Sequence, residues 1–259
     1  MEVHHHAHTA DPDSHRGRKK WAHYLWEFLM LFLAISLGFY AENLREGIKH
    51  KEEVKTHMRS LLSDLESDVL LFDSVIERNG YSSIMADSLI NLLHSDVSNT
   101  PAIYYTARSV TANVGYYYSN SKSFDQMKSS GLLRFINPKD LLDSIGTYYV
   151  SFQWLANQTD LMRLKLDEVH KGNTALFDSY TFYQMMNVGL STYNGRHLII
   201  NMPEGHPALL SSNFKDINAV SLNYHYYSTT IRFYNRTALA QKQRAERLIE
   251  LIKKEYSFD

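Results

Sequence analysis

The sequence predicts an all-α protein in which an N-terminal transmembrane helix continues into an elongated antiparallel helical bundle. One observation is a 21-residue apolar segment near the N-terminus, and another is a pair of long heptad stripes. A third is the placement of proline, which breaks helix interiors. All five prolines lie outside residues 13–100, 139–202 and 208–259, so each of these stretches can hold a long helix.

Residues 21–41, WAHYLWEFLMLFLAISLGFYA, form the predicted transmembrane helix. A helix of this length is about 31 Å long, which matches the hydrocarbon core of a bilayer. Only Glu27 carries a formal charge, and we leave open whether it pairs with His23 as a relay or reaches the interface. Aromatic side chains that would lie at the two membrane interfaces are Trp21, Tyr24, Trp26, Phe39 and Tyr40.

Two other interpretations of this segment fit the sequence less well. A cleaved signal peptide requires a small residue three positions before the cleavage site, where Phe39 would lie. A core helix of a soluble protein keeps its apolar residues on one stripe, whereas here they cover all faces. We therefore expect an uncleaved membrane anchor.

Basic residues decide the predicted orientation, because segments rich in Lys and Arg stay in the cytoplasm. Four of them directly precede the segment: Arg16, Arg18, Lys19 and Lys20. Those that follow it are spread out and alternate with glutamates. We expect a cytoplasmic, His-rich and basic tail at residues 1–20, a transmembrane helix at 21–41 and an extracytoplasmic helical bundle at 42–259.

The membrane helix is expected to continue through residues 42–78, where apolar residues recur every three or four positions. Gly80 is predicted to end it, and residues 82–94 to form a shorter amphipathic helix. Thr100 as cap and Pro101 as first residue predict the start of the next helix.

That helix is expected to run towards residue 130 with an interruption near 115–123. Gly131 is predicted to end it in a left-handed conformation, rather than to form part of an anion-binding loop. Asn137 and Pro138 then predict the start of a long helix that ends at residues 171–172. Its heptad stripe consists of Leu141, Ile145, Tyr148, Phe152, Leu155, Thr159, Met162, Leu166 and Val169.

A short helix is expected within residues 174–187, and a loop at 189–212 with a short extended piece at 197–201. The last helix is predicted at about 214–256. Its stripe consists of Ile217, Val220, Tyr224, Tyr227, Ile231, Tyr234, Ala238, Gln241, Ala245, Leu248 and Ile252. Such stripes fit either a bundle within one chain or a coiled coil between chains, and both remain open at this point.

Composition excludes several function classes. The chain has 27 Lys and Arg against 28 Asp and Glu, and this balance argues against a dedicated nucleic-acid binder. It has no cysteine, so disulfides, thiolate zinc sites and cysteine nucleophiles are excluded. The Tyr clusters at residues 104–105, 116–118 and 224–227 cannot all face inward, so some are expected on a surface or in a cleft.

No catalytic or cofactor-binding motif is found, so we expect no enzyme activity and no cofactor. The weak metal-site candidates are His4, His5, His6 and His8, because imidazole side chains are good ligands for transition-metal ions. Asp167 and His170 have the spacing found in di-iron bundles, but without a second such motif they predict only a surface pair.

The MEVHHH start, the EFLMLFLAISLGF segment and the KSSGLLRFI motif together resemble a family of uncharacterised single-pass membrane proteins of Bacteroidetes-type bacteria. The resemblance covers residues 1–60 and 124–136. It implies a bacterial membrane protein with a native His-rich start. Together with the predicted orientation, this leads us to expect a single-pass protein of the bacterial inner membrane with its C-terminal domain in the periplasm. It supplies no catalytic residue.

Topology guides the expected function. Only about twenty residues would lie in the cytoplasm, too few for an output domain. We therefore expect a membrane-anchored protein that acts in protein–protein interaction, scaffolding or sensing, with the lipid bilayer and a protein partner or a second copy as its partners. The alternative is a small-molecule-binding module with an aromatic cleft between its helices.

Overall fold

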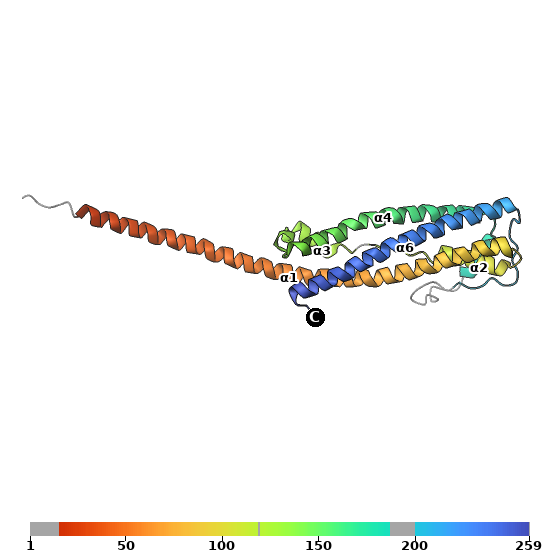
Figure 1. Cartoon of the computed structure of the whole chain (residues 1–259), viewed down its shortest axis with the longest axis horizontal. Coiled ribbons are helices and arrows are strands. Elements are labelled where there is room, and N and C mark those ends of the chain that lie inside the picture. Colours follow the sequence, from red (N-terminus) through yellow and green to blue (C-terminus); the bar gives the residue numbers. More distant parts are fainter. Residues whose placement is uncertain (1–15, 119, 187–199, 259) are drawn as a thin grey trace, which may run out of the picture. The chain divides into compact units, whose positions relative to one another are not determined.

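The computed structural model describes residues 16–118, 120–186 and 200–258 of this 259-residue chain. Across these residues the protein consists of six α-helices and one short 3-10 helix, with no strand (Figure 1). The predicted all-α fold is thus confirmed. The elements are α1 (Arg16–Ser95), α2 (Thr100–Ala112), α3 (Lys122–Ser129), η2 (Leu132–Phe135), α4 (Lys139–Asn173), α5 (Ser179–Met186) and α6 (Phe214–Tyr256).

The chain divides into two compact units, with the boundary between Glu53 and Val54. The first unit contains the N-terminal part of α1. The second contains the rest of α1, all the other helices and both hydrophobic core clusters. The boundaries expected after residues 20 and 41 stay predictions.

Helices α4 and α6 run antiparallel within the second unit. Ser151 on α4 donates to Gln241 on α6 with an Oγ–Oε1 distance of 2.8 Å. Further along α4, the Glu168 carbonyl accepts a hydrogen bond from Asn223, which lies earlier on α6. Residue numbers therefore rise along one helix as they fall along the other.

Helix α1 runs parallel to α4, so the chain must return between them. Tyr148 contacts Asp68, and Phe152 packs one turn later against Phe72. The return path consists of α2, residues 113–121 and α3. It lies antiparallel along α1 and completes an up-down-up-down bundle whose second arm is broken in the middle.

Side chains of α1 hold this broken arm in place. Asn79 donates from Nδ2 to the Gly115 carbonyl at 3.0 Å and accepts from the Gly115 N–H at 2.9 Å. Asp64 accepts from the N–H of Ser123 at 3.1 Å, at the start of α3. The backbone at Gly115 lies so close to α1 that a Cβ there would be 3.2 Å from Val75 backbone atoms.

Both predicted heptad stripes are buried inside one chain. All eleven predicted residues of the α6 stripe are buried. In α4, seven of the nine are buried, while Phe152 and Leu166 are partly buried. The stripes therefore form the core of a bundle within one chain, rather than a coiled coil between chains.

The predicted end of the first helix at Gly80 is wrong, because α1 continues without a break to Ser95. Gly80 keeps helical geometry, and the predicted second helix at 82–94 is simply the last part of α1. Ser82 donates to the carbonyls of Val110 and Asn113 across the bundle. Tertiary hydrogen bonds to these polar residues therefore outweigh the local sequence preference for a turn.

Two helix starts are shifted by one residue. The cap of α2 is Asn99, whose side chain accepts from the Ala102 N–H, and Thr100 is already helical. Helix α4 begins at Lys139 with Pro138 at the cap position, because Pro138 has an extended ψ of 163°. The predicted stop at Gly131 is confirmed by its left-handed φ of 72°.

The segment that joins α4 and α6 has the predicted order of a short helix followed by a loop. The short helix expected within 174–187 is α5, and residues 200–213 have no regular structure. Most of the expected extended piece at 197–201 lies outside the described residues.

Candidate functional site

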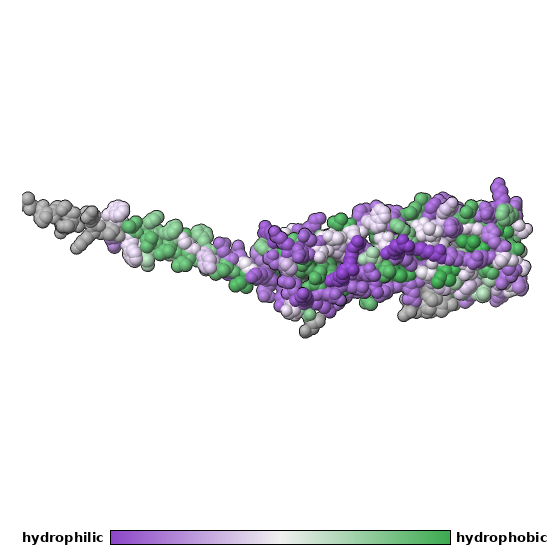
Figure 2. Space-filling view, viewed as in Figure 1, coloured by the Kyte–Doolittle hydropathy of each residue, from purple (hydrophilic) through white to green (hydrophobic). Residues whose placement is uncertain are grey.

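The predicted membrane segment lies within α1, and its apolar side chains are exposed. Its hydrophobic window is long and apolar enough to cross a membrane, and none of that window is buried. Figure 2 shows apolar surface along the N-terminal part of α1, whereas the visible face of the bundle mixes apolar and polar residues. The aromatic residues proposed as interface anchors are all more than 60% exposed: Trp21, Tyr24, Trp26, Phe39 and Tyr40.

The one charged side chain of this segment has a partner on its own helix. His23 Nε2 lies 3.2 Å from Glu27 Oε1, one turn apart. The pair fits both interpretations given above for Glu27, a relay or an interfacial side chain.

No metal centre emerges among the described residues. The His tract at His4, His5, His6 and His8 lies outside them, and the described part of the chain holds no group of three or more metal-ligating side chains. Asp167 pairs with Lys171 at 2.6 Å, and its charge also acts on the neighbouring His170.

A buried carboxylate occupies the centre of the bundle. Asp68 on α1 is 1% exposed and accepts a hydrogen bond from the Tyr148 hydroxyl at 2.8 Å. Burial raises the pKa of Asp68, and the hydrogen bond from Tyr148 opposes that shift. The nearby Asp64 carboxylate also contributes to raising the pKa of Asp68, and Tyr148 lines a pocket between α4 and α6.

Aromatic rings surround this carboxylate and continue to the surface. Tyr117 stacks on Phe72 with ring centroids 4.0 Å apart, and on Phe152 at 5.2 Å. Tyr117 is buried, whereas Tyr118 is 64% exposed. Neighbouring tyrosines thus point in different directions, as the sequence predicts.

Two adjoining hollows open along this aromatic cluster. One, of about 270 Å³, is lined by Tyr117, Tyr118, Phe152, Leu155 and Ala156. The other, of about 520 Å³, shares Phe152 and Ala156 and also touches Phe124 and Tyr149. We call the two together the aromatic groove.

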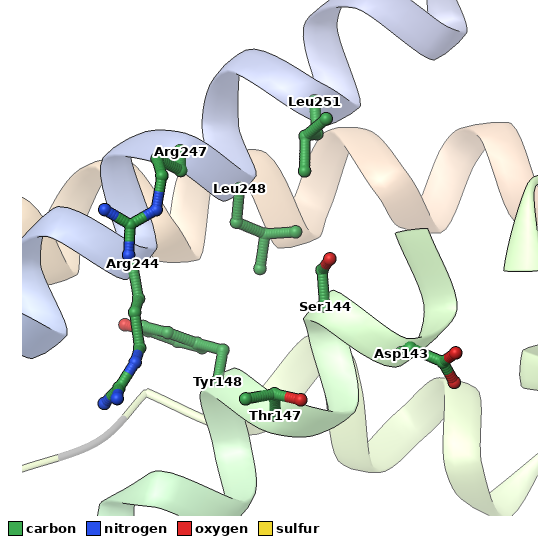
Figure 3. A pocket seen from close by; sticks show the side chains of 8 residues that line it. All are labelled: Asp143, Ser144, Thr147, Tyr148, Arg244, Arg247, Leu248 and Leu251. Atoms are coloured by element: carbon green, nitrogen blue, oxygen red, sulfur yellow. The ribbon is translucent and has the colours of Figure 1, made fainter. Parts of the chain in front are cut away.

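A further pocket, of about 320 Å³, lies between α4 and α6 (Figure 3). Leu248 and Ser144 face each other across it, while Asp143, Arg244 and Arg247 lie at its edges. Both arginines are exposed, and Arg244 donates to Gln241. Because water screens exposed charges so strongly, this pocket would hold an anion only weakly.

The sequence also contains a second stripe on α4 that was not predicted. Four large apolar side chains on this helix are exposed by 41% or more: Val150, Trp154, Leu161 and Leu164. Their steps of four, seven and three keep them on one side of a helix. We call these four residues the α4 outer face.

No family model, curated protein or solved structure matches this chain. The resemblance to bacterial single-pass membrane proteins therefore stays a prediction. The functional argument below is made from the geometry of the described residues alone.

Proposed function

We propose that this protein is anchored in a bacterial inner membrane by residues 21–41, and that its bundle binds a protein partner or a second copy in the periplasm, as a scaffold or sensor. The observation that carries the anchor is the apolar window of α1, which no other part of the described chain covers. Leaving so many large apolar side chains in water would be costly, and a bilayer removes that cost.

The absence of cysteine allows a clean test of the orientation. A single cysteine is introduced at Ser14 in the tail or at Ser88 in the bundle, and intact cells with a permeabilised outer membrane are treated with a membrane-impermeant maleimide. Ser88→Cys should react and Ser14→Cys should react only after lysis. The reverse pattern would overturn the proposed orientation.

The α4 outer face supports the interaction part of the proposal. Exposed apolar side chains that gather on one face are typical of protein-binding surfaces, and tryptophan is enriched among the residues that contribute most to binding. Trp154 is 54% exposed on this face. It is therefore the residue at which a partner is expected.

A photo-crosslinking amino acid tests this expectation. Placed at Trp154 in the full chain in native membranes, it should give a discrete crosslinked product, and the same amino acid at the exposed Glu250 of α6 should not. The mass of the product separates a second copy from another protein. Equal products at both positions, or none at Trp154, would contradict the proposal.

The aromatic groove favours a second candidate function, the binding of a small aromatic molecule. Its apolar rings and its size suit such a ligand. Indole serves as the probe, and Ala156→Phe fills the groove, whereas Ala219→Phe places the same ring on an exposed site of α6. Saturable indole binding that only Ala156→Phe removes supports this function, and binding that Ala156→Phe leaves unchanged rejects it.

A further inference from the structure

Among the residues that the structure describes, Arg108 on α2 is a half-buried cation without an anionic partner. Its guanidinium carbon lies 5.6 Å from the centre of the Phe182 ring, on α5. Its Nε atom is buried and donates no hydrogen bond within the described residues. Burial lowers the pKa of Arg108, but an arginine stays charged at physiological pH.

The neighbouring carboxylates already bind other groups. Asp167 pairs with Lys171 at 2.6 Å, and Asp178 accepts from the N–H of Thr181 at 2.8 Å. No ion pair of Arg108 is found in the part of the chain that the structure describes, and residues 187–199 contain no Asp or Glu in the sequence. A half-buried guanidinium without a counter-charge loses part of its hydration, and an anion from solution would relieve that cost.

The guanidinium borders a cavity of about 170 Å³ whose described lining contains no acidic side chain. Asn173 is buried there, and its Oδ1 accepts from the Tyr224 hydroxyl at 3.0 Å, which leaves its Nδ2 as a donor. His170 and Ser179 lie on the same cavity. Donors without an acidic side chain among them select an anion and disfavour a cation.

The cavity is small and partly open to solvent. Its volume is about 170 Å³. Pockets for drug-sized ligands begin near 300 Å³. The wall formed by Phe177 and Phe182, whose rings stack with centroids 5.0 Å apart, adds an apolar side.

We propose that this cavity between α2, α4 and α5 binds a small oxyanion, a carboxylate or a phosphate, through Arg108 and Asn173. Guanidinium groups bind both kinds of oxyanion through paired hydrogen bonds. The proposal does not depend on the function proposed above, because it uses neither the membrane segment nor the α4 outer face.

Calorimetric titration of the full chain in a neutral detergent tests the proposal, with sodium acetate and inorganic phosphate as separate probes and sodium chloride as the reference for ionic strength. At least one oxyanion should bind saturably, and the comparison of acetate with phosphate identifies which chemistry is preferred. Arg108→Gln should weaken that binding about tenfold or more. The matched control is Arg134→Gln, which removes an exposed arginine that also lies over a ring, that of Phe135.

A second variant keeps the test valid if Arg108→Gln perturbs folding. Asn173→Asp retains an oxygen acceptor for Tyr224 and supplies a carboxylate inside the cavity, so it should abolish oxyanion binding while the protein melts at the same or a higher temperature. Absence of saturable oxyanion binding by the wild type would overturn the proposal. So would binding by both variants with wild-type affinity.

Discussion

Replacing Asn79 by leucine tests how the broken arm of the bundle is held. The side chain of Asn79 is fully buried and forms two hydrogen bonds with Gly115, one to its N–H and one to its carbonyl. Leucine has a similar size and shape but no polar atoms. The substitution therefore leaves both backbone groups without a partner and little space for water to replace it.

The expected cost follows from these two groups. Each buried polar group without a partner costs about 1–3 kcal/mol, so the pair costs about 2–6 kcal/mol. Burial of the leucine side chain returns about 1.5–3 kcal/mol. The net loss in the free energy of unfolding should be about 2 kcal/mol.

Urea unfolding followed by circular dichroism at 222 nm measures this loss. The matched control is Asn157→Leu, the same change at an exposed position of α4. Asn157→Leu should stay within about 0.5 kcal/mol of the wild type, as surface substitutions usually do. Equal stabilities of Asn79→Leu, Asn157→Leu and the wild type would refute the argument that Asn79 fixes residues 113–121.

Three further predictions concern single residues of the bundle. Because burial raises the pKa of Asp68, its contribution to stability is lost as pH rises from its unfolded pKa through the raised folded value. Asp68→Asn should therefore stabilise the bundle at neutral pH, and urea titrations should show that this gain shrinks towards pH 4. Gly131→Ala should cost about 1–2 kcal/mol in the same assay, since φ is 72° there; an unchanged midpoint would contradict this. The Tyr234 hydroxyl accepts from the buried N–H of Tyr117 at 3.0 Å, so Tyr234→Phe should cost about 1–3 kcal/mol, and hydrogen exchange at that N–H should accelerate.

The longest helices could be predicted from the sequence because their signals agree. In α6 a proline-free stretch and an unbroken stripe indicate the same element, and the observed bounds match the prediction. Helix α4 is nearly as clear. Long periodic stripes reflect burial on one face, which is the dominant force in helix packing.

The broken second arm could not be predicted in the same way. Asn79, Gly80 and Ser82 look like a turn when only neighbours in sequence are considered. The side chains of Asn79 and Ser82 form hydrogen bonds with residues more than 25 positions away, at Val110, Asn113 and Gly115. Such long-range hydrogen bonds leave no local periodic signal, so the sequence alone predicts two helices where α1 is continuous.

The candidate sites were predictable to different degrees. The apolar segment can be predicted from composition. The sequence also predicts that neighbouring tyrosines differ in exposure. The α4 outer face also has a sequence signal, a second apolar stripe beside the heptad stripe, which a search for one stripe per helix misses. The cavity at Arg108 has none, because its residues come from three helices that only the tertiary fold brings together.

Alkaline carbonate extraction of cell membranes tests the central claim most directly, that residues 21–41 cross a bilayer. The full chain should remain in the membrane pellet and be released only by detergent. A variant without residues 21–41 should be found in the soluble fraction with an unchanged unfolding midpoint of its bundle. Recovery of the full chain in the carbonate supernatant would contradict the account.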